Sequence, residues 1–218
     1  MKIENILKHL QEAPLPDDWD KSIYSDRVSF KKRIEYAKQH AKRIGGGSAR
    51  VAFEIPYQGR QTVLKVAKNR KGMAQNEEEA GMLRTAEVLG ASGSVVVPMI
   101  DYDETQSQPT WLHVEYARKL KSTNEFKRLT GFELEDLLAY AAKISSLNFP
   151  GRQKEFSKEF EEAVWKEDSF AYDLVSFIGN TEMHLGDLTR PANWGVYKNR
   201  PVIIDMGASE DIIRKFYS

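Results

Sequence analysis

The sequence predicts an α+β protein, with an antiparallel sheet and one associated helix followed by a mainly helical part. Three observations predict this class. Apolar residues alternate over 51–55 and recur over 62–67, which is typical of paired strands. Helical periodicity takes over from about residue 118, and two short strands close the chain. With 218 residues and 41% apolar content, the chain fits one large domain or two small lobes around a shared cleft.

Composition excludes several classes of function. The net charge is zero, which argues against a nucleic-acid binder, since such proteins usually carry a basic excess. There is no cysteine, so disulfides, thiolate metal sites and cysteine nucleophiles are excluded. Charges interrupt the N-terminal segment, which therefore does not resemble a signal peptide, and no window matches a membrane span. We expect a cytoplasmic protein without a membrane partner.

The first part of the chain predicts helices before strands. Residues 2–12 form an amphipathic pattern that ends at Pro14, and Ser29 is placed to cap a helix over about 30–43. A glycine run then connects this helix to a strand at 51–55. The remaining expected elements of the first lobe are a turn at 57–60, strands at 62–67, 94–101 and 111–116, and a helix over 76–89.

The second part predicts helices and a final hairpin. A strong apolar stripe predicts a helix over 133–147, and residues 154–177 predict one or two more. Short apolar segments at 194–196 and 202–204 flank a polar turn at 198–200, which indicates a hairpin.

The glycine run consists of Gly45, Gly46, Gly47 and Ser48. Glycines let a backbone approach a ligand closely and present N–H groups to an anion, but the run also fits a flexible connection. It lacks the Gly-Lys-Ser/Thr ending of a P-loop. It also follows a helical pattern and opens a strand, which is the reverse of a dinucleotide fingerprint.

Lys65 and Glu79 form the second candidate feature. Lys65 lies between apolar neighbours in the strand at 62–67, one hairpin after the glycine run. Glu79 shares a helix face with Leu83 and Ala86, so we expect it to point inward, where a glutamate needs a cation. Glu77 is the alternative, because the helix phase is uncertain by one or two residues. A solvated lysine and a solvated first helical turn are the simpler interpretations.

Asp187, Asn193 and Asp205 form the third candidate feature, near the end of the sequence. Each residue alone is also a common turn former. Their order after the glycine run, the strand lysine and the helix glutamate is the order of parts that a kinase-like phosphotransferase needs.

Several of these residues, and a linker strand, fit ATP and Mg²⁺. Oxygens of Asn193 and Asp205 suit Mg²⁺, which prefers hard oxygen ligands. Lys65 would pair with the α- and β-phosphates and be held by Glu79, while Asp187 would orient the acceptor hydroxyl and take its proton. The strand WLHVEYA would pass beside the adenine, with backbone groups between Glu115 and Ala117 bonding the base edge. Candidates for the apolar walls around the adenine are Val51, Val63 and Met99.

Three segments carry a resemblance to a known family. HLGDLTRPANWGV resembles the catalytic loop of the protein-kinase-like superfamily, in the diverged branch that includes aminoglycoside-type and other small atypical kinases. VIIDMG resembles the metal-binding Asp-Phe/Leu-Gly element of those enzymes, and VLKVAKNRKGMAQNEEEAGML is similar to small kinase-like proteins of bacteriophages. The resemblance covers residues 44–207. It implies an N-terminal helical extension (1–43), a kinase-like N-lobe (44–117) and a reduced helical C-lobe (118–218).

The sequence departs from the family pattern in four places. Ala49 or Arg50 stands where the third glycine is expected, although Arg50 could itself reach a phosphate. His184 lies one residue too far from Asp187, so we assign it no role, and Asn193 lies one residue too far on the other side, which calls for a local bulge. Few residues follow Gly207, so we expect no activation segment and no large C-terminal subdomain.

Three interpretations of the function remain open. The resemblance implies an ATP- and Mg²⁺-dependent phosphotransferase, whose acceptor is either a protein or a small molecule. The alternative is a catalytically inactive kinase-like scaffold that serves as a nucleotide-binding, partner-docking or phage structural protein, in the host cytoplasm if phage-encoded. Nucleotidyl transfer by the same fold is a third possibility. Residues 1–43 either pack on the N-lobe or hold a partner.

Overall fold

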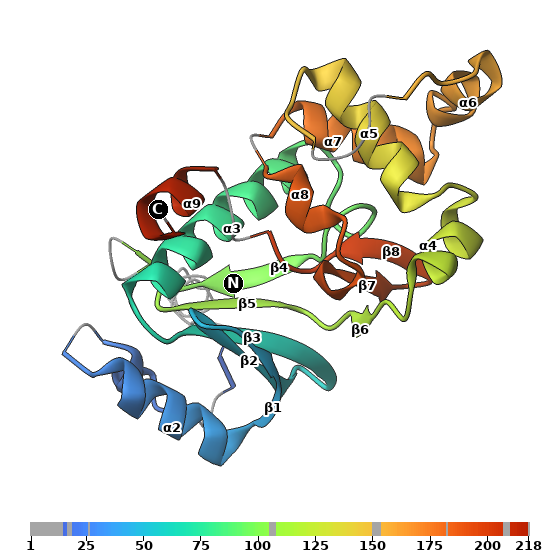
Figure 1. Ribbon diagram of the computed structural model, residues 1–218. Coiled ribbons are helices and arrows are strands. Elements are labelled where there is room, and N and C mark those ends of the chain that lie inside the picture. The colour runs from blue at the N-terminus through green and yellow to red at the C-terminus, as the bar shows by residue number, and fades with distance from the viewer. Residues whose placement is uncertain are drawn as a thin grey trace, which may run out of the picture. The chain divides into compact units, whose positions relative to one another are not determined.

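The computed structural model describes residues 15–16, 19–25, 27–104, 108–149, 154–181, 183–206 and 210–217, and has the α+β composition that the sequence predicts (Figure 1). The helix expected over 2–12 lies outside the described residues. The chain divides into two compact units, Met1–Asn76 with Met99–Glu115, and Glu77–Pro98 with Tyr116–Ser218. Within the described residues, no helix combines the length and apolarity that crossing a bilayer requires.

The first unit is an antiparallel sheet. Among the described residues, two helices precede its first strand, and the start of α3 (Arg70–Val88) follows β3. Its five strands are in the order β1-β2-β3-β5-β4. Tight pairing of β2 with β3 is set by the turn residues Gln58 and Gly59, which both have positive φ, as the hairpin prediction requires. The elements are η1 (Lys21–Tyr24), α2 (Phe30–His40), β1 (Lys42–Gly46), β2 (Arg50–Tyr57), β3 (Arg60–Ala67), β4 (Met99–Tyr102) and β5 (Trp111–Glu115).

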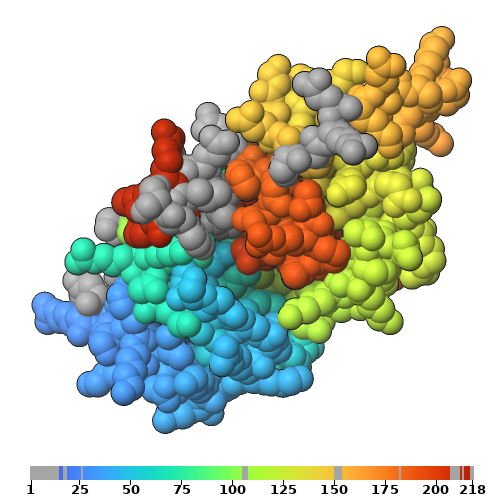
Figure 2. Space-filling model, viewed as in Figure 1, coloured from blue at the N-terminus to red at the C-terminus, as the bar shows by residue number. Residues whose placement is uncertain are grey.

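The described residues between 15 and 40 cover one face of this sheet. Ser29 caps α2 as predicted, because its hydroxyl accepts the Lys32 N–H at 3.4 Å. Trp19 and Ala37 share one buried core with Phe53 and Leu64 of the sheet, and Figure 2 shows α2 and β1–β3 as one continuous block of blue and cyan. The described part of the N-terminal extension therefore packs on the sheet, and its apolar burial stabilises that face.

The strand register assigns every sheet residue to a face. Directly opposed residues of antiparallel strands share a face, so Phe53 and Leu64 mark the face that α2 covers. Ala52, Lys65 and Leu112 form a row on the opposite face. The strand lysine is thus separated from the α2 core by the sheet itself.

Helix α3 (Arg70–Val88) begins six residues earlier than the sequence pattern predicts. The side chain of Asn69 accepts the Gly72 N–H at 3.0 Å, which satisfies an N–H group of the first turn. A Cβ on Gly72 would lie 2.2 Å from the carbonyl oxygen of Ala49, so the first turn passes close to the start of β2. Because the first turn of α3 contains Gly72 and polar residues, it lacks the apolar periodicity from which the start of a helix is predicted. Residues up to Asn76 belong to the first unit and the rest of α3 to the second.

The second unit is mainly helical, with a small sheet in the order β6-β7-β8. Helix α5 packs on α7 and on α8, and α4 packs on β8. Its elements after α3 are β6 (Arg118–Lys119), α4 (Thr123–Thr130), α5 (Leu134–Ser145), α6 (Lys158–Val164), α7 (Phe170–Gly179), α8 (Leu185–Leu188), η2 (Pro191–Asn193), β7 (Trp194–Tyr197), β8 (Arg200–Ile203) and α9 (Glu210–Tyr217).

Two predicted boundaries are wrong. The helix expected over 30–43 ends at His40, because residues from Lys42 onward pair with β2 as strand β1. Of the strand expected over 94–101, only residues from Met99 onward join the sheet of the first unit. Val97 instead donates its N–H to the Ile203 carbonyl at 3.0 Å, which fixes the segment after α3 to β8.

Glu125 ties β6 to α4 and makes stability depend on pH. Its carboxylate accepts hydrogen bonds from the Arg118 guanidinium at 2.8 Å and the Lys121 N–H at 2.8 Å. These contacts lower the pKa of Glu125 to about 2, from about 4.5. A carboxyl group with a lowered pKa stabilises the fold above its unfolded pKa, and this contribution is lost as the pH falls through the folded value. We expect the free energy of unfolding to fall between pH 4.5 and 2.

Urea unfolding at a series of pH values measures this effect. Glu125→Gln should flatten the decrease, whereas Glu135→Gln at an exposed position of α5 should leave the decrease unchanged. An identical pH dependence in wild type and Glu125→Gln would show that Glu125 is not responsible.

Candidate functional site

The glycine run lies in the connection between two strands. Gly45 and Gly46 end β1, while Gly47 and Ser48 lead into β2, so we call residues 45–50 the glycine loop. A Cβ on Gly46 would lie 3.1 Å from the Arg50 carbonyl oxygen, which explains a glycine there. The expectation of a helix-to-strand connection is wrong, because the run begins inside strand β1 and leads into β2, so it connects two strands.

Backbone groups of the glycine loop are partly engaged. The Gly47 N–H donates to the Arg50 carbonyl at 3.0 Å and closes the turn. Within the described residues, the N–H groups of Ser48 and Ala49 have no hydrogen-bond partner. Consecutive N–H groups of this kind suit an anion.

Lys65 lies in the middle of the sheet, opposite Ala52 on one side and Leu112 on the other. Its side chain is largely buried, at 8% exposure, on the face away from α2. A positive charge on a largely buried residue attracts an anion more strongly than a charge at the surface does, because water screens it less.

The apolar candidates near Lys65 divide between the faces. Val63 and Met99 both pair with Val114, so they share one cross-strand row on the face of Lys65. Val51 pairs with Val66 and packs in the α2 core. Val51 therefore lies on the other face from Lys65, so it does not fit the predicted wall, and Ala52 is the β2 residue opposite Lys65.

Glu79 is fully buried in α3, whereas Glu77 is exposed. Leu83 and Ala86, which share its helix face, are also buried. The inward orientation expected for Glu79 from helical phase is thus confirmed by burial, and Glu77 is unsuited to the role of a buried anion.

The linker residues Glu115 and Ala117 fall on either side of the division between units. Glu115 pairs with Arg60 at 2.8 Å, so its carboxylate supports the sheet rather than a ligand. Ala117 directly precedes β6 and is nearly buried. Only their backbone groups are candidates for contact with a base edge, as the sequence predicts.

Asp187 and Asn193 are joined through the backbone. Asp187 lies in α8, and the Asn193 amide donates to its carbonyl oxygen at 2.8 Å. The additional residue between them is taken up by the helical turns of α8 and η2, not by a bulge in a strand. The Trp194 indole N–H donates to the Leu188 carbonyl at 2.7 Å and so anchors the end of α8. The Asn193 amide oxygen remains as the acceptor of that side chain.

Asp205 lies beside this turn. The N–H of the preceding residue, Ile204, donates to the Asn193 carbonyl at 2.9 Å, and the Asp205 side chain is exposed. The second unit therefore brings Asp187, Asn193 and Asp205 together around the start of β7. No cluster of three or more His, Cys, Asp or Glu side chains suited to a metal occurs among the described residues. A metal held by Asn193 and Asp205 would need oxygens from a ligand.

His184 packs against the same turn. Its ring lies 2.8 Å from where a Cβ on Gly186 would stand, and its Nδ1 is buried without a hydrogen-bond partner in the described residues. The sequence assigned no role to His184, and these contacts are those of a packed side chain.

Gly195 lies between Ala117 and Ile204 and leaves room for both side chains. A Cβ on this β7 residue would lie 2.8 Å from both Ala117 Cβ and Ile204 Cγ2. We expect Gly195→Ala to lower the free energy of unfolding by about 1–3 kcal/mol, the usual cost of overpacking.

The matched control for this substitution is Gly81→Ala. Gly81 lies in α3 with open space around its missing Cβ, so alanine there should be neutral or stabilising. Urea unfolding of both variants measures the difference. A Gly195→Ala variant as stable as wild type would contradict the close packing of Ala117 and Ile204.

The candidate residues are distributed over both units. The first unit contains the glycine loop, Lys65 and Glu115, and the second contains Glu79, Ala117, Asp187, Asn193 and Asp205. Three further residues had no place in the predicted site. Arg190 lies 3.5 Å from the Asp187 carboxylate, Trp194 anchors α8, and Gly195 separates Ala117 from Ile204. A glycine in the middle of a short apolar strand is the one sequence signal that pointed to a close approach.

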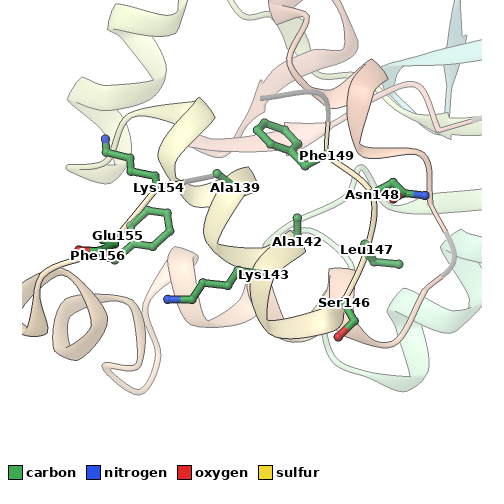
Figure 3. A pocket seen from close by; sticks show the side chains of 10 residues that line it. All are labelled: Ala139, Ala142, Lys143, Ser146, Leu147, Asn148, Phe149, Lys154, Glu155 and Phe156. Carbon is green, nitrogen blue, oxygen red and sulfur yellow. The ribbon is translucent and has the colours of Figure 1, made fainter. Parts of the chain in front are cut away.

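A separate cavity of about 810 Å³ lies along α5 (Figure 3). Of the residues that line the cavity, Lys143 and Phe156 lie on one side of the α5 ribbon, and Leu147 and Phe149 lie on the other. None of the candidate site residues lines this cavity.

Comparisons with known proteins gave structural matches alone. A scan of family models and a search of curated proteins found no match. The chain is similar to a crystal structure of the M. tuberculosis PknI kinase domain, with a TM-score of 0.37 and 14% identity over 78% of this chain and 57% of that chain. A second structure of the Mycobacterium tuberculosis PknI kinase domain gives a TM-score of 0.36 and 15% identity over 78% and 59%. The chain spans less than two thirds of the length of either kinase domain.

Proposed function

We propose that this protein is an ATP- and Mg²⁺-dependent phosphotransferase with a two-lobed, kinase-like fold of the small atypical type. The observation that carries the proposal is the turn around β7, where bonds of 2.8 and 2.9 Å link Asn193 to Asp187 and to the residue before Asp205. A carboxylate, an amide and a second carboxylate held on one rigid turn are the groups that phosphoryl transfer requires.

Each residue has a defined task in the proposed reaction. Asn193 and Asp205 would supply oxygens to Mg²⁺, whose other ligands are phosphate oxygens and water. Lys65 would neutralise the α- and β-phosphates, with Glu79 as its counter-ion. Asp187 would accept a hydrogen bond from the acceptor hydroxyl, orient it toward the γ-phosphate and take its proton as the new P–O bond forms.

The nucleotide would also contact the first unit. The free N–H groups of Ser48 and Ala49 suit phosphate oxygens, and the row of Val63, Val114 and Met99 offers an apolar surface to adenine. Backbone groups from Glu115 to Ala117 would bond the base edge. The acceptor is a protein or a small molecule.

Thermal unfolding with and without MgATP tests nucleotide binding. A ligand at about one hundred times its Kd stabilises the folded state by about 2.7 kcal/mol, which corresponds to a rise in Tm of about 5–10 °C. Lys65→Met should reduce this rise, whereas Lys42→Met at an exposed position of β1 should not. No shift at millimolar MgATP would contradict the proposal.

An inactive kinase-like scaffold is the second candidate, and one contact favours it. The Arg190 guanidinium lies 3.5 Å from the Asp187 carboxylate, where it would compete with an acceptor hydroxyl. A scaffold of this kind would bind nucleotide without turnover or serve in partner docking or phage assembly. Incubation with γ-labelled ATP separates the two, because transfer or hydrolysis of the label requires a working Asp187.

A further inference from the structure

The β3–α3 connection binds the carbonyl groups of the glycine loop. Lys68 donates its ammonium to the Gly47 carbonyl at 2.9 Å, and the Asn69 side-chain amide donates to the Ser48 carbonyl at 3.2 Å. The Lys68 backbone N–H donates to the Ala49 carbonyl at 2.7 Å. Three consecutive loop carbonyls are thus held by two consecutive residues of the connection.

The end of the loop is held by the same part of the first unit. Arg50 is a buried residue with 8% exposure, and its guanidinium donates to the Asn76 amide oxygen at 3.3 Å. Asn76 is itself fully buried and donates to the Pro109 carbonyl at 3.1 Å. Arg50, one of the two residues that could stand in place of a third glycine, therefore attaches the loop to α3.

We infer that Lys68 and Asn69 are positioning residues that hold the glycine loop in one conformation before any nucleotide binds. Because its carbonyls are turned toward the β3–α3 connection, the loop leaves the N–H groups of Ser48 and Ala49 for an anion. A loop that is already ordered loses less conformational entropy on binding. The effect of Lys68 and Asn69 on nucleotide affinity rests on the proposed function, whereas their effect on loop order does not.

Both side chains are exposed, so they can be replaced without opening the core. Lys68→Met removes the ammonium donor, and Lys68→Arg restores a cationic donor. Asn69→Ser keeps an oxygen that can cap α3 at Gly72, as Asn69 does at 3.0 Å, but the shorter side chain cannot reach the Ser48 carbonyl. Lys31→Met on the exposed surface of α2 is the matched control for loss of one positive charge.

Amide hydrogen exchange of Gly47 reports on the order of the loop, since this N–H closes the turn onto Arg50. Without nucleotide, we expect Lys68→Met and Asn69→Ser each to speed its exchange about three- to tenfold, the effect of losing one hydrogen bond. Lys68→Arg and Lys31→Met should exchange like wild type, and Tm should be unchanged. The Kd for MgATP should rise about three- to tenfold in the same two variants.

The outcomes separate this inference from the proposed function. Unchanged Gly47 exchange in both variants would overturn the inference, whether or not the protein binds nucleotide. Faster exchange in a protein that binds no MgATP would support the ordering of the loop and refute the proposed function. Faster exchange with an unaltered Kd would overturn the positioning role toward nucleotide.

Discussion

Asp187→Asn is expected to slow phosphoryl transfer by about 10²- to 10⁴-fold, the usual contribution of a general base. The variant should fold normally, because Asn193 and Arg190 contact Asp187 in different ways. Asn193 bonds its backbone carbonyl, which asparagine retains, and Arg190 forms only a long ion pair at 3.5 Å. The Kd for MgATP should stay within about twofold of wild type, because Asp187 is proposed to contact the acceptor hydroxyl and not the nucleotide.

Single-turnover release or transfer of γ-labelled phosphate measures the Asp187 effect directly. Asp173→Asn on α7 is the matched control and should react like wild type. A full rate in Asp187→Asn would show that another group takes the proton, and equal activity loss in both variants would point to a structural cause.

Asp205→Ala is expected to remove the Mg²⁺-dependent part of nucleotide affinity. Even outer-shell partners of a metal site contribute about 10- to 100-fold in affinity, so loss of a direct ligand should raise the Kd for MgATP at least as much. The bond from Ile204 to Asn193 should persist in the variant, because it uses backbone atoms only and the Asp205 residue is exposed.

Calorimetric titration with ATP in Mg²⁺ and in EDTA tests this expectation. Wild type should bind much more tightly with Mg²⁺, and Asp205→Ala should bind equally weakly in both conditions. A variant that keeps a full Mg²⁺ effect would exclude Asp205 as the metal ligand.

The sequence predicts those features that depend on local periodicity. The burial of Glu79 follows from its helical spacing with Leu83 and Ala86, and the β2–β3 hairpin follows from alternation on both sides of Gln58 and Gly59. Ser29 was recognisable as a cap because its hydroxyl acts within one helical turn.

Other features depend on tertiary approach and left no such signal. Strand β1 has glycines and charges in place of alternating apolar residues, and its place in the sheet comes from its pairing with β2. Val51 faces the α2 core. Apolar alternation in the sequence does not show which face of the sheet a helix will cover, so the face of Val51 could not be predicted. The contacts of Lys68 and Asn69 with the glycine loop join residues 21 positions apart, which no local rule predicts.

A crystal structure with Mg²⁺ and a non-hydrolysable ATP analogue tests the central claim most directly. Our account predicts the Lys65 ammonium at about 2.8 Å from an α- or β-phosphate oxygen. It also predicts oxygens of Asn193 and Asp205 at about 2.1 Å from a magnesium ion bound to the same nucleotide. An analogue bound away from these residues, or one that contacts Lys65 while Asp205 and Asn193 hold neither it nor its metal, would contradict the account.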